Sequence, residues 1–92
     1  MTQVTLKFTG HVRSRMKSGQ MDFSFEGTTL RELLRKFFPQ HDVQDLLLDD
    51  RDQLKPYARI VVEGRFSEFV GGLDAPITSG NMVTLINPYF VM

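Results

Sequence analysis

The densest group of chemically active side chains is a basic segment near the N-terminus. Residues 10–19 carry His11, Arg13, Arg15 and Lys17. Guanidinium and ammonium groups bind carboxylates and phosphates through charge-assisted hydrogen bonds, so the segment could hold an anion or an acidic partner. Because glycines flank it and alternating runs lie on both sides, we interpret it as a solvated polar loop.

Acidic side chains gather in the middle of the chain. They lie in residues 42–52 and comprise Asp42, Asp45, Asp49, Asp50 and Asp52. A calcium loop of the EF-hand type also needs a glycine and a closing glutamate, which this segment lacks. His11 and His41 have no second ligand at a helical or hairpin spacing, which argues against zinc. We therefore predict no metal and no cofactor, and interpret the acidic residues as a solvated face.

The sequence contains no pattern typical of an active site. It has no cysteine, no serine paired by motif with a histidine base, and no glycine-rich phosphate loop. Thiol nucleophiles, thiolate zinc sites and disulfides are excluded by the lack of cysteine. We predict that the protein is not an enzyme.

Composition limits the other classes of function. The 92 residues carry 11 basic and 11 acidic side chains, so the formal net charge is zero. Nucleic-acid and membrane-surface proteins normally show a basic excess, and we expect neither partner. The length predicts a single domain over residues 1–92. With no signal peptide and no apolar run of membrane-spanning length, we expect a cytoplasmic protein.

The last thirteen residues are the most distinctive stretch. Residues 82–86 are apolar or β-branched and predict a strand, which Asn87 and Pro88 should end because proline has no N–H to donate. The apolar tail that follows consists of Tyr89, Phe90, Val91 and Met92. We expect these side chains to be buried, against another chain rather than against their own sheet.

Alternating patterns in the first part of the chain predict a β-hairpin and one helix. Residues 3–9 and 20–25 alternate between apolar and polar side chains, as in half-buried strands. Thr29 and Glu32 form a capping-box pattern that starts a helix, and Pro39 ends it. This helix places Leu30, Leu33, Leu34 and Phe37 on one side.

The second part predicts shorter elements. Residues 42–52 should form a short helical turn, and residues 57–63 a strand that ends in a turn at Glu63 and Gly64. Residues 65–70 should be an edge strand, and residues 71–76 a loop. A hairpin, one main helix and a mixed sheet with parallel first and last strands indicate an α+β fold of the ubiquitin-like β-grasp type.

Four motifs in chain order resemble one known family. They are Thr-Leu-Arg-Glu-Leu-Leu at 29–34, Pro-Tyr-Ala-Arg-Ile-Val-Val-Glu-Gly at 56–64, Gly-Gly-Leu-Asp-Ala-Pro-Ile at 71–77 and Gly-Asn-Met-Val-Thr-Leu-Ile-Asn-Pro at 80–88. Together they resemble the MoaD/ThiS-like small sulfur carriers of the ubiquitin-like β-grasp group, with the MoaD-like branch the better match. MoaD-like members are the small subunit of molybdopterin synthase.

The resemblance implies a chemistry that depends on a C-terminal Gly-Gly. In the family, an activating enzyme adenylates this carboxylate, which then becomes a sulfur-donating thiocarboxylate. Here Val91 and Met92 stand where the glycines belong. A β-branched and a bulky side chain should not fit a channel suited to two glycines. The internal pair, Gly71 and Gly72, is interpreted as a structural turn.

Three hypotheses for function follow. The first is a binding module without carrier chemistry, which uses the tail and the outward sheet residues Arg59, Val61 and Ile86. Its partner would resemble a molybdopterin-synthase large subunit, an activating enzyme or a tungsten/molybdenum oxidoreductase. The second is a sulfur carrier or ubiquitin-like modifier in molybdopterin or tungstopterin synthesis with an altered tail. The third is a self-contained structural subunit whose tail folds back and which could form a homo-oligomer by pairing of sheet edges.

Overall fold

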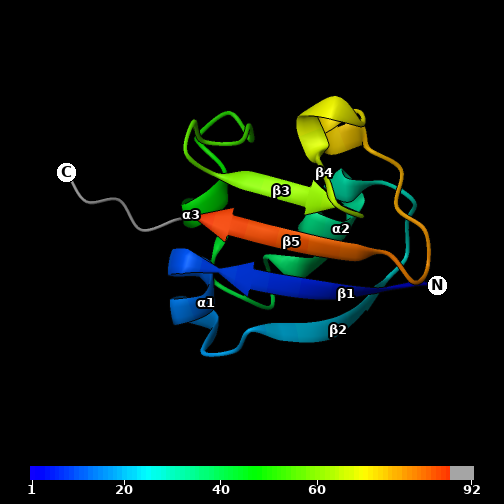
Figure 1. The fold of residues 1–92 in the computed structure, drawn as a ribbon, viewed down its shortest axis with the longest axis horizontal. Helices are drawn as coiled ribbons and strands as arrows, with labels where there is room; N and C mark the ends of the chain where they lie inside the picture. The colour runs from blue at the N-terminus through cyan, green and yellow to red at the C-terminus, as the bar shows by residue number, and fades with distance from the viewer. Residues whose placement is uncertain (88–92) are drawn as a thin grey trace.

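A five-stranded mixed sheet with one main helix behind it organises the protein. The computed structural model describes residues 1–87, and its strands lie in the order β2-β1-β5-β3-β4. Figure 1 looks onto the open face of the sheet, with helix α2 (Leu30–Phe37) behind the strands. The predicted Pro88 break and the tail, Tyr89 to Met92, lie outside the described residues.

Strand β1 (Thr2–Thr9) pairs antiparallel with β2 (Gln20–Phe25), as the alternation predicts. The polar loop predicted between them is wrong, because residues 10–16 form helix α1 (Gly10–Met16). Val12 is fully buried and Met16, four residues later, packs against the core. Only these two apolar residues, one helical turn apart, indicate the helix in an otherwise polar segment.

The predicted capping box starts α2. The Thr29 hydroxyl oxygen accepts from the Glu32 N–H at 3.3 Å, and the Glu32 carboxylate accepts from the Thr28 N–H at 3.2 Å and the Thr29 hydroxyl at 3.1 Å. The return bond thus reaches the residue before the N-cap. The hydrogen bond from Thr28, followed by that from Thr29, lowers the pKa of the Glu32 carboxyl.

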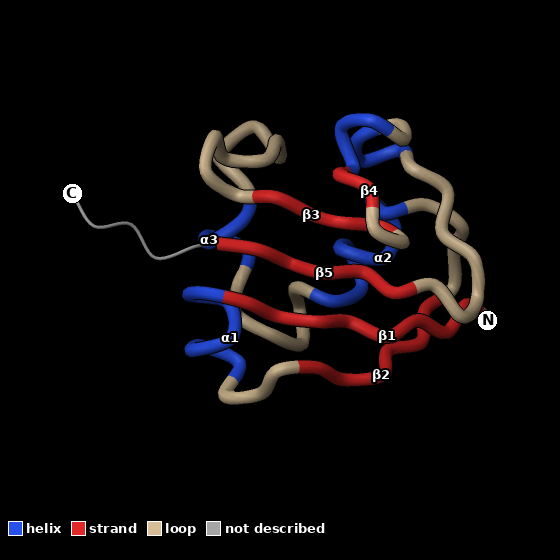
Figure 2. The backbone as a smooth tube through the Cα atoms, in the orientation of Figure 1, coloured by secondary structure: helices blue, strands red, loops and turns tan. Residues whose placement is uncertain are grey.

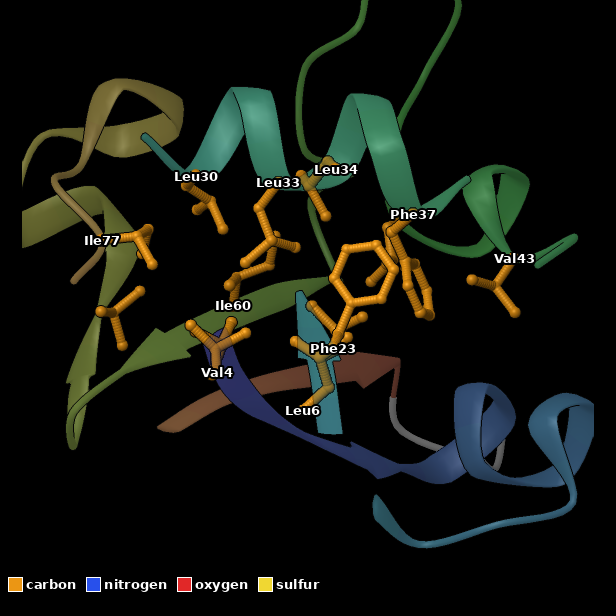
Figure 3. Close-up of a cluster of buried hydrophobic side chains, with 14 of the residues drawn as sticks. Val4, Leu6, Phe23, Leu30, Leu33, Leu34, Phe37, Val43, Ile60 and Ile77 are labelled. Carbon is orange, nitrogen blue, oxygen red and sulfur yellow. The ribbon is translucent and has the colours of Figure 1, made fainter. Parts of the chain in front are cut away.

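The core lies between α2 and the sheet. All four predicted helix residues are buried, and Figure 3 shows them directed toward side chains of the strands. Phe37 is at the centre of an aromatic group, with its ring centroid 5.3 Å from that of Phe23 and 6.1 Å from that of Phe8. Aromatic side chains from inward positions of β1 and β2 therefore pack against the same ring of α2.

The remaining elements are short. Helix α3 (Gln44–Leu47) and strand β3 (Arg59–Val62) confirm the types of the elements predicted over residues 42–52 and 57–63, and both are shorter than predicted. The edge strand predicted over residues 65–70 is wrong in extent, because β4 (Arg65–Phe66) has two residues and continues into the 3₁₀ turn η1 (Ser67–Phe69). A second turn, η2 (Gly72–Asp74), follows, and Figure 2 shows the two turns beside β4. Phe66 and Phe69 are both exposed although a strand would direct them to opposite faces, so the alternation required by a half-buried strand does not continue through residue 69.

The centre of the sheet is formed by the two strands that are furthest apart in sequence. Strand β5 (Met82–Asn87) runs parallel to β1, with Leu6 opposite Val83 and Phe8 opposite Leu85, and antiparallel to β3. A hairpin, a helix packed across the sheet and a parallel central pair confirm the predicted α+β β-grasp architecture.

Candidate partner-binding surface

The face of the sheet opposite α2 is not covered by any other element among residues 1–87 (Figure 1). The register of the strands places the side chains on this face in rows. One row runs Lys7, Thr84, Val61 and Phe66 from β1 to β4, and the neighbouring row runs Thr9, Ile86 and Arg59. We call this surface the open face.

The three sheet residues predicted to contact a partner lie together on the open face. Arg59 is directly opposite Ile86 in the β3–β5 pair, and Val61, two residues further along β3, is opposite Thr84. All three are half-buried, as outward residues of inner strands are. The period of two along each strand was sufficient to predict this grouping.

Arg59 is held by its own chain. Its guanidinium donates to the carbonyl oxygens of Pro56 and Ala58, both at 2.8 Å, and its Nε lies 3.4 Å from the Glu68 carboxylate. The Arg59 side chain therefore connects the loop before β3 to η1. The hydrogen bonds and the ion pair already fix the position of the Arg59 guanidinium. A partner would therefore contact the flat face of this group.

Two exposed aromatic side chains extend the open face at its β4 edge. Phe66 is 43% exposed and Phe69 is 78% exposed, with ring centroids 6.4 Å apart. Met82, in the strand next to β3, is 39% exposed. None of these three residues is among the predicted partner contacts, because Phe66 and Phe69 were expected in a regular edge strand and Met82 in the last strand. The signal was available as two phenylalanines three residues apart, a spacing that no alternating strand can bury on one face.

The exposed aromatic area is large enough to contribute to binding. A phenylalanine side chain carries roughly 150–250 Å² of surface, so the exposed parts of Phe66 and Phe69 sum to on the order of 200 Å². At about 25 cal/mol per Å², covering that area is worth on the order of 5 kcal/mol before the costs of association. This gain depends on the two rings being covered together, which their proximity on one edge of the sheet allows.

Asn87 fixes the end of the described chain. This residue is buried, its side-chain amide donates to the Leu46 carbonyl of α3, and its backbone bridges to Gly10 at the start of α1. The last residue that the structure describes is therefore anchored beside the row that holds Ile86. The predicted contacts by Tyr89, Phe90, Val91 and Met92 stay predictions.

His11, Arg13 and Arg15 of the basic segment lie on α1, and Lys17 follows as its C-cap. Figure 2 shows α1 next to the end of β1, and the bridge between Gly10 and Asn87 places the start of α1 beside the end of β5. Arg15 donates to the Asp45 carboxylate at 2.6 Å, so one basic residue pairs with the acidic cluster. Within residues 1–87, no group of three histidine or acidic side chains is arranged to hold a metal ion. Among the helices of that same range, none has the length and apolar character needed to cross a membrane.

The internal diglycine has a structural role, as predicted. Gly71 has φ of 119° and Gly72 has φ of 64°, conformations that side chains rarely adopt. A Cβ on Gly71 would lie 3.2 Å from the Cα of Ala75, which is tighter than ordinary packing. These glycines allow the turn that leads from η1 into η2.

Comparison with known proteins gave structural matches only. No family model and no curated protein matches the sequence. In the Amycolatopsis orientalis BexX/CysO complex, one chain matches with a TM-score of 0.77 at 20% identity, over 97% of this chain and 99% of that one. Small archaeal modifier protein 1 from Methanosarcina acetivorans matches with a TM-score of 0.82 at 14% identity, over 100% and 98%.

A candidate molybdopterin converting factor, subunit 1, from Pyrococcus furiosus matches with a TM-score of 0.72 at 18% identity, over 97% of this chain and 100% of that one. The chain has the ubiquitin-like β-grasp fold of the small sulfur carriers and modifiers. At 14–20% identity these matches show the fold. They therefore confirm that the resemblance found in the sequence holds for the fold.

Proposed function

We propose that this protein is a non-catalytic, MoaD-like β-grasp binding module, a single domain over residues 1–92 that holds a protein partner through its open face and its tail. The observation that carries the proposal is the group of apolar side chains on the open face, which comprises Val61 of β3, Phe66 of β4 and, in the neighbouring row, Ile86 of β5. Val61 and Phe66 are opposite one another in the β3–β4 pair, with Phe69 beside Phe66. Apolar residues surrounded by polar ones are the usual composition of a protein-binding patch.

The partner is a protein of the kinds that MoaD-like proteins meet: a molybdopterin-synthase large-subunit-like protein, an activating-enzyme-like protein or a tungsten/molybdenum oxidoreductase. A solved complex of a protein with the same fold, BexX/CysO, is consistent with a protein partner. The proposed loss of carrier chemistry rests on Val91 and Met92, which occupy the positions of the family's glycines.

The alternative function is that of a sulfur carrier or modifier in molybdopterin or tungstopterin synthesis. It is favoured by the kinds of protein that share the fold, which include a modifier and a candidate molybdopterin converting factor. Carrier chemistry would require a reactive carboxylate that the binding module does not need. The two functions therefore differ in what happens to the chain end rather than in the fold.

Deleting residues 89–92 tests the role of the tail. We expect the variant to lose most of its association with the partner that co-purifies with the full chain, because several apolar side chains are removed. We also expect it to keep its melting temperature, since all core residues named above precede Pro88. Affinity capture measures association with the partner, size-exclusion chromatography measures the oligomeric state, and thermal melting measures the melting temperature.

A large fall in melting temperature, for a protein that is monomeric with and without the tail, would place the tail in its own core. Loss of a dimer on deletion, with no other protein captured by the full chain, would favour the homo-oligomer hypothesis. Replacement of Tyr89 and Phe90 by serine keeps the chain length and is the matched control for an effect of truncation.

A further inference from the structure

A pocket of about 320 Å³ lies on the helix side of the molecule, away from the open face. It is bordered by α2, by residues 48–52 after α3, and by η2. This volume is at the lower end of the range of sites for small molecules. None of the functions considered above uses it.

The floor of the pocket is apolar and its α2 side is cationic. Leu34, Leu48 and Leu73 contribute apolar surface, and Arg31 and Arg35 lie on one side because they are one helical turn apart. Two guanidiniums and one carboxylate, that of Asp52, line the pocket. The charges of the lining therefore favour an anionic ligand.

The two arginines differ in how they are held. Arg31 Nε lies 3.4 Å from the Asp74 carboxylate, in an exposed and weak pair. Among residues 1–87, the part of the chain that the structure describes, the Arg35 guanidinium makes no direct hydrogen bond or ion pair, although its charge, after the hydrogen bonds from Thr28 and Thr29, contributes to the lowered pKa of the Glu32 carboxyl. A guanidinium without a direct ion pair, beside apolar surface, is a strong donor to a carboxylate, because its planar N–H groups match both oxygens.

The wall opposite α2 is already ordered. The Asp49 carboxylate accepts from the N–H of Gln53 at 3.1 Å and of Arg51 at 2.8 Å, and these bonds lower the pKa of the Asp49 carboxyl. Leu48 and Leu54 bridge at the base of the same loop. A ligand would meet a formed wall and would not have to order the loop.

We propose that this pocket binds a small apolar carboxylate. The carboxylate contacts the guanidinium of Arg35, with Arg31 beside it, and the hydrocarbon part covers Leu34, Leu48 and Leu73. The Asp52 carboxylate also lines the pocket. It carries the same negative charge as the ligand and therefore weakens binding of the ligand. This site is independent of the proposed partner surface, because α2 and the open face are on opposite sides of the sheet (Figure 1).

The test is an NMR titration of the full-length, ¹⁵N-labelled protein with 4-phenylbutyrate. Saturable shifts are expected at amides of α2, residues 48–52 and η2. The uncharged analogue 4-phenyl-1-butanol has the same hydrocarbon body and should bind at least about tenfold more weakly, since a charge-assisted hydrogen bond is lost.

Variants separate the local contact from general charge. Arg35→Gln should weaken 4-phenylbutyrate binding about tenfold, whereas Arg65→Gln, which removes the same charge at β4, should leave it unchanged. Asp52→Asn should strengthen binding by roughly twofold. The proposal is overturned if the alcohol binds as well as the acid, if Arg35→Gln binds like the wild type, if Arg65→Gln weakens binding as much as Arg35→Gln, or if shifts scatter over the surface without saturating.

Discussion

Phe37→Ala is expected to lower the free energy of unfolding by about 3–5 kcal/mol, the usual cost of removing a buried phenylalanine. The side chain has no exposed surface, and its ring contacts those of Phe8, Phe23 and His41, the last with centroids 4.6 Å apart. Alanine would leave a cavity between α2 and the sheet that neighbouring strands cannot close. Urea denaturation followed by circular dichroism measures the change.

Phe69→Ala is the matched control, because it removes the same side chain from an exposed position. Its effect on the free energy of unfolding should stay within about 0.5 kcal/mol. If the two alanine variants unfold at the same urea concentration, Phe37 is not at the centre of the core.

The second large effect concerns the open face. The double variant Val61→Asp, Phe69→Asp is expected to weaken binding of the co-purifying partner by at least about a hundredfold. Charged groups at the centre of an apolar interface are left without partners, and hot-spot residues typically account for 2 kcal/mol or more. Calorimetric titration of the purified partner against each variant gives the affinity.

The charge-matched control is Gln40→Asp, Gln44→Asp, which adds the same two negative charges on polar, exposed positions away from the open face. Its affinity for the partner should equal that of the wild type. Both double variants must keep a cooperative thermal transition for the comparison to hold. Equal affinities for the two double variants would contradict a partner site on the open face.

Most of the fold could be predicted from short-range patterns. In a strand every second residue faces the core, and this spacing is seen in Val4, Leu6 and Phe8. In a helix the core-facing residues recur every three or four positions, as Leu33 and Phe37 do. Helix α1 was missed because only Val12 and Met16 carry its apolar signal, and its other exposed residues are equally compatible with a loop.

Part of the candidate site could not be predicted for a related reason. Arg59, Val61 and Ile86 were grouped correctly because strand periodicity and the β-grasp topology determine the register. The exposure of Phe66 and Phe69 depends on where β4 stops, because the chain leaves the strand after Phe66 and enters the 3₁₀ turn η1, and no repeating pattern in the sequence marks that point. Asn87 was read only as the end of a strand, since a buried amide that bonds to α3 depends on tertiary structure.

The most direct measurement of the central claim, that this chain binds rather than carries sulfur, is the intact mass of the protein purified from its source cells. We predict an unmodified C-terminal carboxylate. We also predict that an activating enzyme of the family does not catalyse ATP–pyrophosphate exchange with this chain. A mass increase that matches the replacement of one carboxylate oxygen by sulfur would contradict the account and establish the carrier function.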